Sequence, residues 1–400
     1  MERFSLSTSD GRVLFLTRTL RLFAYGSLSV VLVFYLMSLG LSAEQTGLLL
    51  TLALVGDTVV SLWLTTRADR IGRRRMLLVG AVLMAAAGLI FASTGNFLLL
   101  VVAGTIGVIS PSGNEVGPFL PIEQAALAQV VPSDRRTAAF AWYALAGSVA
   151  TAVGSLCGGV LAHAPLVAYR GVVLLYAALG AVLALLFSRL SPAIEVGVPD
   201  ASPFLGVSHS RDMVLKLSGL FAIDAYAGGF VVQSFAAYWF YLRFGVDPAM
   251  LGAIFFGANL LAGASALLAS RLASRFGLVR TMVFTHLPSN VLLILVPLMP
   301  NLPLAVLVLL LRFSISQMDV PTRQAYLMAV VRPDERSAAA GITGVARTAG
   351  AAIAPVFAGW MFARPSLIGV PFFLAGTLKI VYDLLLYRGF VGVQPPEDAR

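Results

Sequence analysis

The chain has 400 residues, of which 58% are hydrophobic and only 12% are charged, whereas about a quarter of an ordinary soluble domain is charged. Long apolar runs such as Met76–Phe91 and Val291–Leu311 exclude a soluble globular domain, because a membrane helix needs about 20 residues of this kind. The net charge of +9 comes from arginines that cluster between the apolar runs. We therefore assign the charge to membrane topology and predict no nucleic-acid partner.

The apolar runs, separated by turn residues along the chain, predict an all-α membrane protein with twelve transmembrane helices. A barrel is disfavoured, since no ten-residue alternation of polar and apolar positions occurs. Ser191–Arg211, rich in proline and glycine, is predicted to link a bundle of residues 1–190 to a bundle of residues 212–400. The predicted helices are 12–38, 43–66, 75–95, 97–131, 136–162, 167–190, 212–243, 248–271, 279–299, 302–331, 337–363 and 367–390.

Arginine is distributed unevenly between alternate loops. By the positive-inside rule, the rich loops lie in the cytoplasm, and both termini are then cytoplasmic. The scarcity of lysine is typical of GC-rich bacterial genomes, so we expect the bacterial inner membrane. The rich loops are Arg67–Arg75, Arg135–Arg136, Arg271–Arg280 and Arg332–Arg336, and the poor ones contain Arg170, Arg243 and Arg364.

Enzymatic chemistry has no support in the sequence. One cysteine, Cys157, excludes an internal disulfide framework, and three histidines without cysteine partners at ligand spacing predict no built-in metal site. There is no G-x-S-x-G, no H-E-x-x-H and no nucleotide-binding loop, so we predict neither an enzyme nor a bound cofactor. The polar N-terminus, without a small-residue cleavage site, predicts no removable signal peptide.

The two halves share a repeated element. Residues 121–139 read PIEQAALAQVVPSDRRTAA and residues 321–339 read PTRQAYLMAVVRPDERSAA, with Pro, Gln, Asp and Arg identical at a constant offset of 200. Common apolar composition does not supply such polar matches in register. A second correspondence joins the loop residues 70–75 to residues 275–280. We infer a duplicated six-helix unit.

Two parallel six-helix repeats and one loop motif resemble the major facilitator superfamily. The family signature G-x-x-x-D-R-x-G-R-R between helices 2 and 3 is similar to residues 65–74, with Thr65 in place of its first glycine. The resemblance implies alternating access by a monomer and a cytoplasmic lock between the loops and helix 11. The residues that it places in this cytoplasmic gate are Asp69, Arg70, Gly72, Arg73, Arg74, Asp134, Arg136 and Arg336.

Helix 5 contains Gly154-Ser-Leu-Cys-Gly-Gly159, which resembles the G-P-x-x-G-G of antiporters in that family, with Ser155 in place of proline. The resemblance favours efflux by antiport. Small residues at this spacing are equally typical of close helix packing, so both interpretations stay open.

Charged residues within the predicted spans are the candidates for coupling and substrate binding, because a carboxylate in a membrane interior needs a partner, water or a proton. The resemblance implies that helices 1, 4, 7 and 10 line the cavity. Asp319 and Arg323 are four residues apart and predict a local ion pair, which either lines the path and exchanges partners during transport or is a permanent structural pair. The same reasoning pairs Lys379 with Asp383 and assigns this pair no role. The candidates on the cavity helices are Arg21, Asn114, Glu115, Glu123, Asp224, Gln233, Arg312, Asp319 and Arg323.

Glu115 is the first choice for binding the coupling proton or cation. It lies in Gly113–Pro118, where glycine and proline weaken the helix, and irregular backbone at membrane depth requires a protein-buried or wet setting. The competing interpretation is a kinked helix in which Glu115 bonds to a neighbour. Glu123 corresponds to Arg323 in the repeat, so we expect the two to meet when the cytoplasmic side closes. Asp224 and Arg21 are similarly predicted to pair across the halves, with Gln233 on a polar stripe beside Asp224.

The sequence thus predicts a secondary transporter, with proton-coupled efflux of an amphiphilic or cationic compound as the leading function. The mixture of acids and bases suits such a solute, whereas a strongly anionic one would require several unpaired arginines in the cavity. The alternatives are a metal or metabolite transporter, a uniporter, and a non-transporting receptor on the same scaffold. His286 is interpreted as a hydrogen-bonded packing residue.

Overall fold

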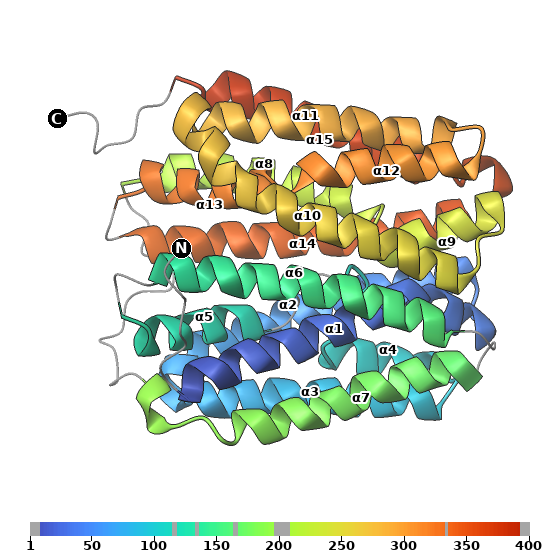
Figure 1. Cartoon of the computed structure of the whole chain (residues 1–400), viewed down its shortest axis with the longest axis horizontal. Coiled ribbons are helices and arrows are strands. Elements are labelled where there is room, and N and C mark those ends of the chain that lie inside the picture. The colour runs from blue at the N-terminus through green and yellow to red at the C-terminus, as the bar shows by residue number, and fades with distance from the viewer. Residues whose placement is uncertain are drawn as a thin grey trace. The chain divides into compact units, whose positions relative to one another are not determined.

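The structure is a computed structural model that describes residues 9–113, 118–132, 136–162, 167–195, 209–332 and 335–392. Every regular element in these residues is a helix (Figure 1). Eleven of the helical segments are long and apolar enough to cross a membrane, and α4 (Phe97–Ile106) is a shorter apolar helix. The chain therefore has the predicted all-α architecture of a multi-pass membrane protein.

The chain divides by its contacts into two compact units, which we describe separately. Unit 1 comprises Met1–Asp200 and Gln233–Phe256, and unit 2 comprises Ala201–Val232 and Gly257–Arg400. Unit 1 contains α1 (Ser9–Ser38), α2 (Ala43–Ile71), α3 (Arg73–Ser93), α4, α5 (Phe119–Val130), α6 (Arg136–Leu161), α7 (Val167–Phe187), η2 (Pro192–Ile194), α9 (Gln233–Phe244) and the start of α10 (Pro248–Phe276).

Unit 2 holds the remaining elements. They are α8 (Arg211–Gly229), the rest of α10, α11 (Leu278–Leu295), η3 (Val296–Leu298), α12 (Leu302–Ser316), α13 (Asp319–Val330), α14 (Arg336–Phe362), η5 (Pro365–Leu367) and α15 (Val370–Phe390).

Three predicted helices are interrupted, which corrects the continuous spans 97–131, 212–243 and 302–331. α4 ends at Ile106, and residues 107–113 are not helical. α8 ends at a pair of glycines, after which the Phe230 and Val231 amides bond carbonyls three residues back in a tight turn. α12 ends at Ser316 and α13 begins at Asp319. The third residue of α13, Pro321, has no amide hydrogen to donate to the preceding turn.

The repeat is visible in the element boundaries. α5 and α13 begin and end at positions 200 apart, and each has a proline as its third residue. Helices α1 and α8 follow a different offset, since Gly26 packs on the Thr151 carbonyl and Gly229 packs on the Ala351 carbonyl. Thr151 and Ala351 are 200 apart, whereas the two glycines are 203 apart. This shift of three residues decides which charged residues correspond.

Helices α1 and α6 of unit 1 pack with their backbones in close approach. A methyl group at Gly154 would lie 2.1 Å from the Phe23 carbonyl oxygen, and one at Gly158 would lie 2.3 Å from that of Ser27. Gly159 makes a similar approach to Pro248 and Gly252 of α10. The glycines of the Gly154–Gly159 segment thus serve close packing, as one of the two sequence interpretations predicted.

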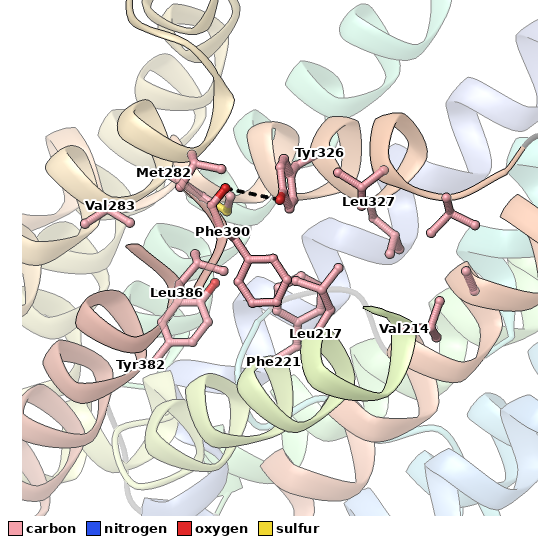
Figure 2. Close-up of a cluster of buried hydrophobic side chains, with 14 residues drawn as sticks. Val214, Leu217, Phe221, Met282, Val283, Tyr326, Leu327, Tyr382, Leu386 and Phe390 are labelled. Atoms are coloured by element: carbon pink, nitrogen blue, oxygen red, sulfur yellow. Dashed lines mark hydrogen bonds between the residues drawn. The ribbon is translucent and has the colours of Figure 1, made fainter. Parts of the chain in front are cut away.

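Unit 2 has an apolar core between α8, α11, α13 and α15, with one residue of α14. Figure 2 shows Phe221 of α8, Tyr326 of α13 and Phe390 of α15 turned toward one another. The Tyr326 hydroxyl donates to the Phe390 carbonyl at 3.4 Å, which satisfies its polar atom within the cluster. The core joins side chains of α8 and α13, and both helices contribute charged residues to the site described next.

Candidate functional site

Unit 1 contains a fully buried ion pair between α1 and α5. Both guanidinium Nη atoms of Arg21 donate to the two oxygens of Glu123 at 2.7 Å, and both side chains are 0% exposed. Glu123 also accepts from the Thr17 hydroxyl at 3.0 Å and from the Tyr143 hydroxyl. These bonds occupy the carboxylate's roughly four acceptor positions, so the charge is compensated without water.

The Arg21 guanidinium also stacks on Phe119 of α5, with its carbon atom 4.6 Å from the ring centre. Arg18, one turn earlier on α1, donates to the Tyr143 carbonyl at 2.7 Å and lies 4.4 Å over the Tyr143 ring. The buried cations of α1 thus have partners on neighbouring helices of unit 1. Bidentate, stacked geometry is what arginine provides and lysine does not.

Unit 2 contains a more branched network centred on Asp224 of α8. One carboxylate oxygen is 3.0 Å from the Arg323 Nη1 atom of α13, and the other is 2.5 Å from the Lys379 Nζ atom of α15. Arg323 is also 3.1 Å from Asp319, so the predicted i, i+4 pair is present. The Arg323 guanidinium lies 5.4 Å over the Phe221 ring. One carboxylate therefore holds cations from two other helices.

The two networks are charge-reversed versions of each other. At the offset of 203 for the first helix of each half, Arg21 corresponds to Asp224. At the offset of 200 for the α5 and α13 pair, Glu123 corresponds to Arg323. Unit 1 thus pairs a base on its first helix with an acid, and unit 2 pairs an acid on the corresponding helix with a base. Both Arg21 and Asp224, predicted to pair across the halves, have their partners within their own units.

A second polar cluster lies behind Asp224, between α11 and α15. The His286 Nδ1 atom is 2.9 Å from Asp383, and the Asn290 amide donates to the other oxygen of the same carboxylate at 2.9 Å. The His286 Nε2 atom lies 3.8 Å from Asp224, which connects the two clusters. His286 is hydrogen-bonded as predicted, but the expected Lys379–Asp383 pair is wrong. Lys379 reaches Asp224 on α8, because a buried carboxylate on a neighbouring helix outweighs helical spacing.

The loop between α2 and α3 takes its form from Gly72, whose φ of +115° is accessible chiefly to glycine. Gly277 holds the corresponding place between α10 and α11 with a φ of +87°. The Arg73 side chain is buried and donates to the Ile194 carbonyl at 3.1 Å. Glu195 accepts from the Arg73 and Arg74 amides at 2.7 and 3.1 Å, so it caps the positive end of α3.

Several predicted site residues lie outside the described residues or have undescribed side chains. Asn114, Glu115 and Asp134 are in the first group, and the side chains of Asp69 in α2 and Arg136 in α6 are in the second. Their predicted roles stay predictions.

The remaining predicted residues are placed as follows. Arg70 and Arg74 are exposed at the α2–α3 turn, and Arg336 begins α14. Gln233 begins α9, separated from α8 by the tight turn, and donates to Ser29 at 2.8 Å and Ser155 at 3.1 Å. It therefore bonds α1 and α6 within unit 1 instead of continuing a stripe along the helix of Asp224. Arg312 lies in α12 with its guanidinium 4.9 Å over Phe313.

Sequence reasoning missed the residues whose partners are on other helices. Thr17, Tyr143 and Glu195 carried no motif, and Lys379 was assigned to the wrong partner. A repeat alignment that allowed the three-residue shift would have shown Arg21 opposite Asp224. Among the described residues, no group of three or more His, Cys, Asp or Glu side chains is arranged to hold a metal ion.

Comparison with known proteins gives the following matches. The profile of the Major Facilitator Superfamily matches residues 14–239 and 217–400. The uncharacterized membrane protein YJR124C of Saccharomyces cerevisiae is 30% identical, over 98% of this chain and 96% of its own length. The quinolone resistance protein NorA of Staphylococcus aureus is 27% identical over 33% of each chain.

Solved structures with the same fold include the nucleoside transporter NupG and a D-xylose–proton symporter. The NupG structure has a TM-score of 0.73 and 12% identity, covering 95% of this chain and 99% of its own. The symporter has a TM-score of 0.73 and 14% identity, covering 95% of this chain and 98% of its own.

Proposed function

Because the chain belongs to the major facilitator superfamily of secondary transporters, we propose that it exports an amphiphilic or cationic compound in exchange for protons. It is a multi-pass membrane protein whose family consists of transporters and not of enzymes. We further propose a monomer in a bacterial inner membrane, with both termini in the cytoplasm and two halves, residues 1–190 and 212–400, joined by the linker 191–211.

One observation carries the coupling proposal, namely the sharing of Asp224 by Arg323, Lys379 and the more distant His286. A carboxylate that bridges cations from two other helices holds α13 and α15 against α8 by charge. Protonation of Asp224 would remove both ion pairs at once and free two cations to find other partners. A proton is therefore converted into a change of helix contacts, which is what coupling requires.

Export is supported by the partial similarity to NorA, whose name states quinolone resistance, over a third of the chain. The antiporter-like glycines of α6 add little support for export, since close helix packing accounts for them. For the cytoplasmic lock, we propose that Asp69 and Arg73 act with Asp134, Arg136 and Arg336. The capping of α3 by Glu195 supports a stiff loop in which such contacts are made reproducibly.

The test uses purified full-length protein in proteoliposomes that contain a pH-sensitive dye. Ethidium, a fluorescent cationic amphiphile, and norfloxacin, a zwitterionic quinolone, are the probes. Wild type is expected to accumulate a probe when a proton gradient is imposed and to move protons when a probe gradient is imposed. Asp224→Asn is expected to lose accumulation at least tenfold while it retains exchange of labelled for unlabelled probe, because an amide cannot carry the proton.

Asp212→Asn is the matched control, since this acid is exposed in the first turn of the same helix. It should behave as wild type. Proton-independent accumulation by wild type would contradict the coupling, and full accumulation by Asp224→Asn would exclude Asp224 as its carrier. Binding without exchange by wild type would identify a receptor instead of a transporter.

A further inference from the structure

Two arginines of unit 2 are left over by the ion-pair networks. Arg312 of α12 and Arg347 of α14 are partly buried, and the Nε atom of each is fully buried without a hydrogen-bond partner among the described residues. Neither forms an ion pair with a described carboxylate. Both interact electrostatically with Asp224 and Asp319 from beyond ion-pair distance. They are therefore positive charges inside the unit, close to the network but not neutralised by contact.

The electrostatic surroundings of Arg347 are also unfavourable. The charge of Arg323 repels it, while Asp224 and Asp319 are already engaged by Arg323. A partly buried cation without a contacting anion costs free energy, because it loses part of its hydration and gains no partner. Such a cost is tolerated where a function requires the unpaired charge.

Unit 1 provides an internal comparison for this position. Gly147 stands 200 residues before Arg347, and the Arg18 side chain covers it, 2.7 Å from where a methyl group would be. Arg18 is bonded to the Tyr143 carbonyl and stacked on its ring. The same region of the fold thus holds a hydrogen-bonded arginine in unit 1 and, in unit 2, an arginine whose buried Nε atom has no hydrogen-bond partner among the described residues. Packing at this position therefore does not by itself require an unpartnered arginine.

We infer that Arg347 and Arg312 bind an oxyanion of the transported solute, and that this solute is an amphiphile with a carboxylate or a similar acidic group. The inference rests on the proposed transport function and narrows its substrate class. Planar guanidinium groups bind carboxylates in a bidentate manner, and an incoming anion would neutralise the charge that the network leaves over. A zwitterionic amphiphile fits, because it carries such an oxyanion. A purely cationic solute does not fit.

The binding test uses three unbranched naphthalene compounds that differ in their polar group: 1-naphthylacetate, 1-naphthylacetamide and 2-(1-naphthyl)ethylamine. Thermal unfolding of the full chain in detergent reports binding without requiring transport. The acetate is expected to raise the unfolding temperature of wild type, and the amide and amine are expected to raise it less. Arg347→Gln and Arg312→Gln should each weaken acetate binding by about 10- to 100-fold, as expected for loss of a charged hydrogen bond.

Arg271→Gln is the control, because this arginine is exposed on α10 of the same unit, and it should bind acetate as wild type does. A second readout needs no ligand. Arg347→Gln should leave the unfolding temperature of the free protein unchanged or raise it, because an unpaired cation is removed, whereas Arg323→Gln should lower it. A fall with Arg347→Gln equal to that with Arg323→Gln would show a structural role and overturn the inference.

Three further results would overturn the inferred anion site. The first is an equal rise of the unfolding temperature with acetate in wild type and both arginine variants. The others are a larger rise with the amine than with the acetate, and no rise of wild type with the acetate. The proteoliposome assay separates this from the transport proposal. Proton-coupled movement of norfloxacin, which carries a carboxylate, that is unaffected by Arg347→Gln would leave the exporter in place and reject the anion site. Arginine-dependent acetate binding without any proton movement would do the reverse.

Discussion

Unit 1 and unit 2 place opposite charges at corresponding positions, and they surround those charges differently. In unit 1, Arg21 and Glu123 meet in one bidentate pair that two hydroxyl groups complete. In unit 2, Arg323 is divided between two carboxylates, and Asp224 is divided between two cations. The first arrangement has one favourable geometry, whereas the second keeps several alternative pairs within reach. Corresponding positions therefore hold one bidentate pair in unit 1 and a branched network in unit 2.

The largest expected effect comes from breaking the pair in unit 1. Glu123→Gln leaves Arg21 buried at 0% exposure without an anion, which should cost about 3–5 kcal/mol of unfolding free energy. Asp319→Asn in unit 2 leaves Arg323 with Asp224 and should cost only about 1–2 kcal/mol. Unfolding by SDS titration measures both. Equal losses would mean that the two networks are equally fixed.

A charge exchange sharpens the comparison further. Since unit 2 carries the acid on its first helix and the base on the other, the double change Arg21→Glu with Glu123→Arg restores an ion pair in the orientation of unit 2. It should recover about 2 kcal/mol relative to the sum of the single changes in a double-mutant cycle. Recovery should stay incomplete, because Thr17 and Tyr143 donate to a carboxylate at position 123 and cannot donate to arginine. Additive single effects would contradict the correspondence.

The sequence predicted the pairs that lie within one helix better than those between helices. Spacing sufficed for Asp319 and Arg323, because residues four apart share a face wherever the helix lies. The same rule failed for Lys379, since tertiary packing brought a second carboxylate, Asp224, within its reach. The partner of Glu123 was hidden because the two first helices are shifted by three residues relative to the repeat. No local pattern encodes such a shift.

The fold was predicted more completely than the site, because apolar runs and turn residues are local signals. Twelve spans followed from hydropathy, and the similarity of residues 121–139 to residues 321–339 revealed the duplication. The breaks before α13 and after α8 were not predicted, although Pro321 and Gly229 mark them. A proline in the first turn of a new helix and a proline inside a longer helix look alike in sequence. The two cases differ only in whether the residues before the proline are helical, which the sequence does not show.

The closest backbone contacts offer a smaller test of whether the units are equivalent in packing. Gly26→Ala would place a methyl group 2.2 Å from the Thr151 carbonyl oxygen, and Gly229→Ala would place one 2.5 Å from that of Ala351. Each should cost about 1–3 kcal/mol through overpacking. Gly219→Ala is the control on α8, where nothing lies within 4 Å, and it should stabilise by up to about 1 kcal/mol. A loss confined to one unit would show that only that unit depends on close helix approach.

The smallest expected effects concern the paired turns at Gly72 and Gly277, which both have positive φ. Alanine at either position should cost about 1–2 kcal/mol, because a side chain is strained in that conformation. The loss should be greater at Gly72, where a methyl group would lie 3.3 Å from the Glu195 carboxylate that caps α3, whereas nothing lies within 4 Å at Gly277. In a Glu195→Gln background the cap on α3 is already weakened. The losses of unfolding free energy caused by the two alanine substitutions should then be nearly equal. A difference that persisted there would mean that backbone strain, and not the cap, distinguishes the two turns.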